Sequence, residues 1–269
     1  MSNIRNSIYE IRFVDEMSQK DTFIHKLHPL VKLIVTVIYI TTTVSYSKYE
    51  IIAMIPLMIY PIVVFNLSDI QFLPVFKRSL IVLPVVLGLG IFNPIMDKDA
   101  ITIFANVSIA GGWISYLSLI IKCFLTVFCA LLLISTTSID KITMALRYIH
   151  VPKIIAMQFL FTYRYIYVLM EEFENMWTAY SLRAPGQRGV HYKSIGPLLG
   201  QLLMRTYDRA QRIYYCMVLR GYNGEYQQNE CNLNLKDYIY LCIWTIFLFF
   251  IKYNNVPVIL GNIMTGGQQ

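Results

Sequence analysis

Charged residues are scarce in this sequence. Only 14% of the 269 residues are charged, whereas 56% are hydrophobic and the mean hydropathy is +0.51. A soluble domain usually carries about 25% charged residues. The composition therefore excludes an ordinary soluble domain and favours a membrane protein.

The chain also lacks paired cysteines and a cleavable signal. None of its five cysteines stands in a C-x-x-C spacing, so the sequence predicts neither disulfides nor a zinc site. The N-terminal arm is polar and charged, which is unlike a secretory signal peptide.

Catalytic and nucleotide-binding motifs are missing as well. The segment 189–194 ends like a phosphate loop, but its glycine spacing is wrong. The sequence contains no H-E-x-x-H or G-x-S-x-G motif. His25 and His28 are three residues apart, yet two ligands are too few for a metal site. We therefore expect a non-catalytic chain with no cofactor or metal site and no ATP site of its own.

Five apolar stretches predict membrane-spanning helices. About 20 residues cross the roughly 30 Å hydrocarbon core at a rise of about 1.5 Å per residue. A further apolar segment, Ile101–Ala110, is too short to span, and we expect it at the interface or packed on the bundle. The five stretches are Leu30–Tyr46, Glu50–Asn66, Ser79–Pro94, Gly112–Thr137 and Asp237–Ile251.

Several residues interrupt these stretches. Pro56 and Pro61 lie inside the second one, where neighbouring helices can satisfy the carbonyls that proline leaves unbonded. Gly88 and Gly90 in the third stretch allow close helix approach or mark a kink. Lys122 is the one charge of the fourth stretch, and we expect it to snorkel or to form a structural pair.

Positive charge is distributed asymmetrically. Twelve of the 23 lysines and arginines lie between Lys141 and Lys236. If the N-terminal arm is inside, the outer segments hold only Lys48, Lys98 and Lys252, and a short inner loop holds Asp69, Lys77 and Arg78. The positive-inside rule then predicts a cytoplasmic N-terminus and a cytoplasmic segment at residues 138–235.

The predicted fold is all-α, a polytopic membrane helix bundle of about five spans with a cytoplasmic domain of long amphipathic coupling helices. Residues 1–137 hold the arm and four spans, 138–235 the cytoplasmic domain, and 236–263 the last span. Residues 264–269 resemble part of an epitope tag and are set aside.

The cytoplasmic segment holds two long helical patterns. The first runs from Pro152 to Leu182 without internal proline or glycine, which makes it about 45 Å long. The second has an apolar stripe and an opposite polar face, and Gly221 is its expected C-cap. The stripe comprises Leu199, Leu202, Leu203, Thr206, Ala210, Ile213, Tyr214 and Met217, and the polar face comprises Arg205, Asp208, Arg209 and Arg212.

Both helical patterns end at an arginine followed by a small residue. The two ends read Leu182-Arg183-Ala184 and Leu219-Arg220-Gly221. The helix macrodipole alone favours arginine at a C-terminus by about 0.3–1 kcal/mol, which explains each arginine taken singly. It does not explain two such ends in tandem. A small neighbour lets a partner surface approach, and a guanidinium group can bond carboxylates or carbonyls in a groove.

These motifs resemble the CbiQ-type transmembrane T component of energy-coupling factor (ECF) transporters, the subunit of cobalt and nickel uptake systems. The resemblance covers nearly the whole chain. The family's paired triplets are Ala-Arg-Gly-like, so the arginines match and the flanking residues deviate, most at Ala184. Besides the two arginine ends, it rests on Leu27–Lys32, Arg147–Pro152, Phe161–Tyr165, Arg209–Tyr214 and Tyr222.

The resemblance implies a non-catalytic coupling subunit in a prokaryotic cell membrane. Its implied partners are two ATP-binding cassette ATPases, which bind the ATP, and a CbiM-like membrane subunit that captures the cobalt or nickel ion, with room for a small CbiN-like subunit. It implies no nucleic-acid partner. Leu182, Arg183, Ala184, Leu219, Arg220 and Gly221 are the residues implied to dock the ATPases.

Two other functions remain open from the residues. One is a shared T component that serves vitamin-binding subunits. The other is a membrane-embedded enzyme acting on lipid or prenyl substrates. Such an enzyme generally needs an acidic metal-binding cluster, and only Glu171, Glu172 and Glu174 approach one. These carboxylates are more typical of a solvated helix face.

Overall fold

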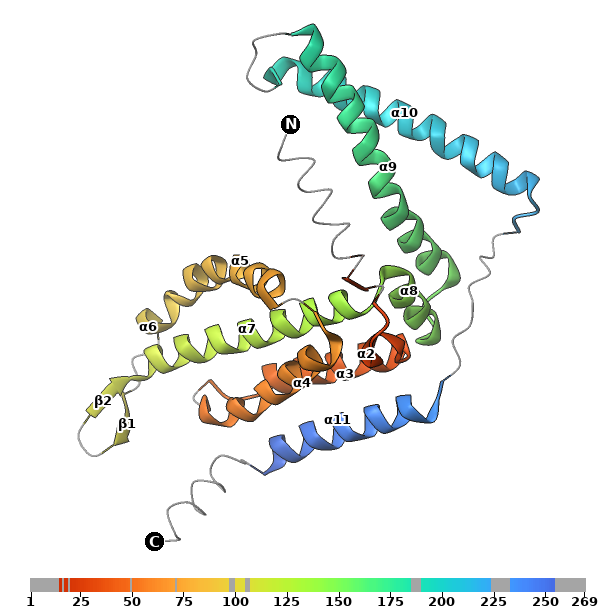
Figure 1. Ribbon diagram of the computed structural model, residues 1–269. Helices are drawn as coiled ribbons and strands as arrows, with labels where there is room; N and C mark the ends of the chain where they lie inside the picture. Colours follow the sequence, from red (N-terminus) through yellow and green to blue (C-terminus); the bar gives the residue numbers. More distant parts are fainter. Residues whose placement is uncertain are drawn as a thin grey trace. The chain divides into compact units, whose positions relative to one another are not determined.

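The computed structural model describes residues 15, 17–18, 20–48, 50–70, 72–96, 100–104, 107–184, 190–223 and 233–254. The chain divides into two compact units (Figure 1). One unit holds the helices that precede residue 139 together with the last described helix. The other holds the three helices between residues 139 and 219.

The first unit is a bundle of apolar helices, and it confirms the predicted all-α membrane fold. Two helical segments, Leu73–Pro94 and Gly111–Thr136, are long and apolar enough to cross a membrane. Shorter apolar helices accompany them. The helices of this unit are α2 (Phe23–Lys26), α3 (Pro29–Val44), the 3-10 helix η1 (Ile52–Met58), α4 (Ile59–Ser68), α5 (Phe72–Gly90), α6 (Phe92–Met96), α7 (Gly111–Thr136) and α11 (Leu235–Tyr253).

Capping residues account for where α3 and α11 begin. Pro29 occupies the first turn of α3, and the His28 side chain caps that turn because its Nδ1 accepts from the Leu30 N–H at 3.3 Å. At the start of α11, Asn234 and Asp237 form a reciprocal capping box. Polar residues therefore set the start of both apolar helices.

The second predicted span differs from a single α-helix. Its first part is the 3-10 helix η1, which contains Pro56, and α4 follows with Pro61 near its start. Proline has no N–H to donate and its ring crowds the carbonyl four residues earlier, so α-helical bonding is interrupted there. The tighter 3-10 winding is the local response.

One further segment differs from the sequence-based expectation, and a second takes a form that the sequence analysis did not specify. The inner loop predicted around Lys77 and Arg78 is helical, because α5 already begins at Phe72. Lysine and arginine favour helix, so the apolar pattern of α5 extends through them. The described residues of Ile101–Ala110 lie in two antiparallel paired strands, β1 (Ala100–Phe104) and β2 (Val107–Ala110), in which Ala100 pairs with Ala110. The β-branched residues among them favour strand.

Aromatic side chains join three helices in the core of this bundle. Tyr39 of α3 and Tyr60 of α4 have ring centroids 5.0 Å apart. Trp244 of α11 meets Tyr60 edge to face at 4.7 Å. The Tyr39 hydroxyl donates to the Leu57 carbonyl at 3.2 Å, so this buried polar group is satisfied. Edge-to-face aromatic pairs add about 0.5–1.5 kcal/mol each beyond area burial.

Two lysines inside the bundle donate to main-chain carbonyls. Lys32 is buried, and its Nζ donates to the Thr136 carbonyl at the end of α7, at 2.9 Å. Lys122 Nζ donates to the Tyr46 carbonyl just beyond α3, at 2.5 Å. The last carbonyls of a helix have no intrahelical donor, so lysines suit these positions. Structural pairing was one of the two roles predicted for Lys122.

The second unit consists of α8 (Ile139–Tyr148), α9 (Lys153–Arg183) and α10 (Tyr192–Leu219). Pro152 is the N-cap residue of α9, one position before the first turn in which it was predicted. Helix α9 ends at Arg183, which agrees with the predicted helix within one residue. At about 1.5 Å per residue, α9 and α10 are each more than about 40 Å long.

Candidate docking site

The first arginine end terminates α9 on the surface of its unit. Arg183 is exposed, and the preceding Leu182 is 77% exposed. Ala184 is the C-cap residue, and its N–H bonds the Tyr180 carbonyl at 3.1 Å. The Tyr180 hydroxyl also accepts from the His191 N–H at 3.2 Å, which links the end of α9 to the start of α10. The predicted turn over residues 185–189 lies outside the described residues.

The second arginine end terminates α10 in a Schellman motif. The Gly221 N–H bonds the Val218 carbonyl at 2.9 Å, and the Tyr222 N–H bonds the Met217 carbonyl at 2.9 Å. Gly221 has φ +82°, the left-handed conformation that this motif requires. The predicted C-cap role of Gly221 is thus confirmed. Arg220 and Leu219 are exposed on the last turn that this motif closes.

A second Schellman motif connects α8 to α9. His150 has φ +65°, and its N–H bonds the Arg147 carbonyl at 3.1 Å. The Val151 N–H bonds the Leu146 carbonyl at 3.2 Å, and Pro152 follows directly. Histidine is one of the few residues enriched over other non-glycine residues in this conformation. The Arg147–Pro152 segment therefore has a defined structural role, which is to end α8 and start α9.

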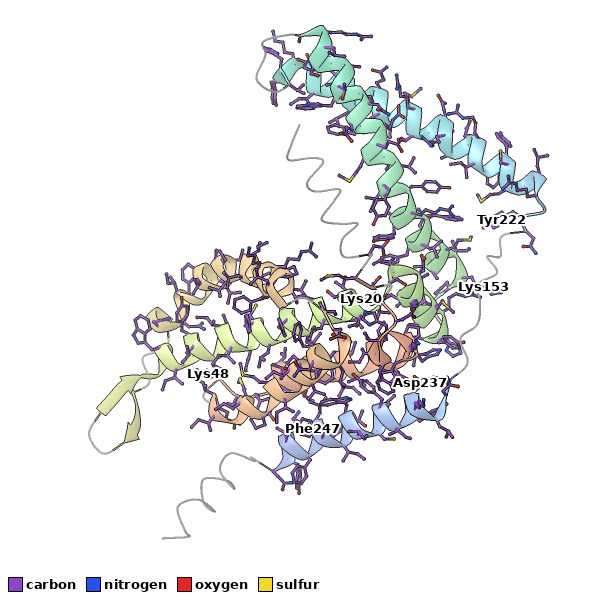
Figure 2. All side chains as sticks on the ribbon, viewed as in Figure 1. Lys20, Lys48, Lys153, Tyr222, Asp237 and Phe247 are labelled. Carbon is purple, nitrogen blue, oxygen red and sulfur yellow. The ribbon has the colours of Figure 1, made fainter. Side chains whose placement is uncertain are left out.

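Helices α9 and α10 run in opposite directions and spread apart from the end where they meet (Figure 1), and three side-chain contacts join them and the flanking residue Tyr222, which is labelled in Figure 2. Tyr180 and His191 meet where α9 ends and α10 begins. Arg205 Nη1 pairs with Glu172 Oε1 at 2.6 Å along the helices. The third contact is the Tyr222 hydroxyl, which lies 2.9 Å from the Met157 sulfur near the start of α9.

The antiparallel arrangement puts the two arginine ends at opposite ends of the hairpin. Arg183 is the last residue of α9, whereas Arg220 precedes Tyr222, which contacts the first part of α9. The distance along α9 from Met157 to Arg183 is about 40 Å at standard rise. The structure therefore presents Arg183 and Arg220 as two separate sites and does not bring them together.

The apolar stripe of α10 is only partly covered. Four of its members are half-buried, namely Leu202, Thr206, Ile213 and Met217. The other four, Leu199, Leu203, Ala210 and Tyr214, are exposed. No residue of α10 is fully buried within this unit. An exposed apolar helix face of this extent is typical of a surface that binds a partner.

Arg205 was predicted on the polar face of α10 with Asp208, Arg209 and Arg212. It is exposed, as predicted, and it also pairs with Glu172 of α9. The guanidinium group reaches across because α10 lies against α9 at this level, which spacing within one helix cannot reveal. Glu172 is therefore engaged in an ion pair, which counts against its use with Glu171 and Glu174 in an acidic metal-binding cluster.

The N-terminal histidines have structural roles. Both ring nitrogens of the buried His25 are engaged, Nδ1 with Thr22 Oγ1 at 2.6 Å and Nε2 with the Met17 carbonyl at 3.1 Å. His28 Nδ1 accepts from the Leu30 N–H. Within the described ranges, no group of three or more His, Cys, Asp or Glu side chains is arranged to hold a metal ion.

Residues 20–231 match the family model described as cobalt transport protein, CbiQ. An uncharacterized protein of Methanocaldococcus jannaschii is 27% identical over 85% of this chain and 82% of its own length. The energy-coupling factor transporter transmembrane protein EcfT of Clostridium kluyveri is 25% identical over 81% of this chain and 87% of its own. The nickel permease LarQ of Lactiplantibacillus plantarum is 27% identical over 42% of this chain and 44% of its own.

Proposed function

We propose that this chain, which belongs to the CbiQ family of cobalt transport proteins, is the transmembrane coupling subunit of an ECF-type importer for cobalt or nickel. In this role it catalyses no reaction. Two partner ATPases bind and hydrolyse ATP, and a separate membrane subunit captures the ion. Similarity to a transporter transmembrane protein and to a nickel permease supports the proposal.

The main observation in support of this function is that Arg183 and Arg220 lie exposed at opposite ends of one helical hairpin. Two ends with the same chemistry suit two copies of the same kind of partner, one at each end. Each guanidinium can form two parallel bonds to a carboxylate, and the small residue after it leaves room for a close surface. The exposed Leu182 and Leu219 would add apolar contact beside each arginine.

The hairpin is suited to carry motion between such partners. Helices that are joined at several points move as units rather than deforming continuously. Contacts at Tyr180, Glu172 and Met157 join α9 to α10 and to the residues that flank α10 at three levels. A shift of either arginine end by an ATPase would therefore displace the whole hairpin. The partly uncovered stripe of α10 is the proposed surface for the further membrane subunit.

The proposed location is a prokaryotic cell membrane, with the N-terminus and residues 138–235 on the cytoplasmic side. The lysine and arginine asymmetry supports this orientation through the positive-inside rule. Cytoplasmic ATPases could then reach both arginine ends.

The proposal is tested by reversing the charge at each arginine end. In membranes that contain the chain, its two ATPases and the ion-capturing membrane subunit, Arg183→Glu and Arg220→Glu should each reduce ATPase co-purification and cobalt uptake by at least about tenfold, since a repelled carboxylate replaces a charge-assisted bond. Arg209→Glu is the matched control, an exposed arginine on α10 away from both ends. Unchanged assembly and uptake in both end variants would rule the proposal out.

A further inference from the structure

A cavity lined by both polar and apolar side chains opens in the first unit beside the middle of α7. Its volume is about 630 Å³, within the usual range for small-ligand sites. It lies between α7, the end of α3 with the chain just after it, and α6. The polar residues that line it are Lys48, Asn93, Ser115, Ser118, Lys122 and Thr126.

The α7 residues in this lining share one helix face. Ser115, Ser118, Lys122 and Thr126 follow one another at spacings of three or four residues, which aligns their side chains along the helix. Helix α7 is otherwise long and apolar enough to cross a membrane. Polar side chains gathered on one face of such a helix are costly in an apolar environment and mark functional sites by default.

Ser118 gives the second, independent indication of a ligand. Its side chain is 1% exposed, and its hydroxyl has no hydrogen-bond partner. A buried hydroxyl left without a hydrogen bond is energetically unfavourable. Because Ser118 lines the cavity, a ligand there would supply the missing partner.

The charges of the residues that line the cavity indicate which class of ligand it can bind. Two ammonium groups, Lys48 and Lys122, face the cavity together with hydroxyl and amide donors, and no carboxylate is among its lining residues. Glu50 interacts electrostatically with Lys122 from outside this lining. The Lys122 ammonium group donates one hydrogen bond to the Tyr46 carbonyl. Because an ammonium group has three N–H donors, it can also donate to a ligand. The lining repels a divalent cation and attracts an anion with several acceptor oxygens.

We propose that this cavity binds a phosphate group, with the headgroup of an anionic phospholipid as its source in the membrane. Phosphate oxygens would accept from Lys122, Ser118 and Lys48, and the apolar wall at Val44, Leu119 and Cys123 would contact the adjoining glycerol and acyl carbons. Attraction between basic side chains and anionic headgroups is a general element of lipid recognition. The bound lipid would link α7 to the segment after α3.

The test measures binding to the purified full chain in a neutral detergent by native mass spectrometry. The probes are phosphatidylglycerol, diacylglycerol, which lacks the phosphate, and glycerol 1-phosphate, which lacks the acyl chains. We expect saturable binding of phosphatidylglycerol and none of diacylglycerol. Binding of glycerol 1-phosphate that competes with the lipid would support the phosphate site and show that it also accepts a soluble source.

Substitutions distinguish lipid binding at this cavity from nonspecific adsorption of lipid to the protein. Lys122→Gln should weaken phosphatidylglycerol binding by roughly tenfold or more, because a charge-assisted bond is lost. Ser118→Ala should weaken it by a few-fold without disturbing the fold, because its hydroxyl bonds nothing in the protein. Glu50→Gln should strengthen it by removing a competing carboxylate.

Lys77→Gln changes an exposed lysine of α5 outside the cavity and should leave binding unchanged. Equal binding of phosphatidylglycerol and diacylglycerol, or binding that neither Lys122→Gln nor Ser118→Ala alters, would overturn the proposal and leave a water-filled cavity only.

Discussion

Asp237 accepts a hydrogen bond from the backbone N–H of His28, and this contact connects the start of the last helix of the bundle to the start of its first long helix. Asp237 Oδ1 lies 2.8 Å from the His28 nitrogen, although the residues are 209 positions apart. Its other oxygen accepts from the Asn234 N–H at 2.9 Å. Asp237 is only 4% exposed, so one buried carboxylate satisfies backbone donors at two helix starts.

We predict that Asp237→Ala lowers the stability of the bundle. Hydrogen bonds to a charged group contribute about 1.5–3 kcal/mol, and both N–H donors would lose their partner. A loss of about 2 kcal/mol corresponds to roughly 4–8 °C in the thermal midpoint of a chain of this size. Circular dichroism in one detergent at a fixed scan rate measures it. Lys236→Ala, at the exposed neighbouring position, should change the midpoint little.

Gly90 and Gly88 offer a matched pair for the approach of α5 to α7. A Cβ at Gly90 would lie 2.6 Å from the Tyr116 ring, whereas one at Gly88 would meet nothing within 4 Å. We expect Gly90→Ala to cost about 1–3 kcal/mol because the packed helices must separate. Gly88→Ala should be neutral or stabilising, since alanine favours helix by about 1 kcal/mol over glycine. Equal thermal midpoints would contradict this account of the close approach.

Gly221 and Gly200 form a second pair, on α10. Gly221→Ala places a side chain at φ +82°, which costs about 1–2 kcal/mol, and should loosen the last turn that carries Arg220. Gly200 lies inside the helix in open space, so Gly200→Ala should protect the helix. Hydrogen exchange at the Gly221 and Tyr222 amides is the measurement, with faster exchange expected only in the first variant. If Gly221→Ala leaves exchange unchanged, the Schellman motif does not hold this end.

The left-handed backbone conformation of His150 ends α8. His150→Gly should raise the stability by about 0.5 kcal/mol, because relief of the left-handed conformation exceeds the entropy that glycine loses on folding. His150→Val should lower it, since β-branched residues are strained at φ +65°. Thermal unfolding of the two variants compares them directly. The opposite order would show that the side chain, and not the backbone, makes the main contribution at this turn.

Local chemistry explains which helices could be predicted from the sequence. Helix α9 has no internal proline or glycine, and α7 is a long apolar run, so their predicted ends agree with the structure within about two residues. Glycine after Arg220 indicated the end of α10 in the same way. The family resemblance that rested on these motifs is confirmed by the match over residues 20–231. The docking role of Arg183 and Arg220 stays a prediction.

The errors occurred where local signals conflict. Pro56 and Pro61 are compatible with a kinked α-helix or with a 3-10 turn, and hydropathy does not distinguish the two. Lys77 and Arg78 were assigned to a loop by their charge, although both residues favour helix. Arg205 is exposed on the polar face that its spacing predicted, but its ion pair with Glu172, 33 residues away in the sequence, could not be predicted from that spacing.

The sequence by itself determined that this is an apolar helical protein of a transport family and that two long helices end in arginine. Those properties depend on composition, helical period and capping residues, which act within a few positions along the chain. Only the tertiary structure decided that Arg183 and Arg220 lie at opposite ends of one hairpin, that Asp237 caps a distant helix, and that Ser118 and Lys122 share a cavity with Lys48. Each of these relationships joins residues whose proximity arises from packing, and no local pattern encodes it.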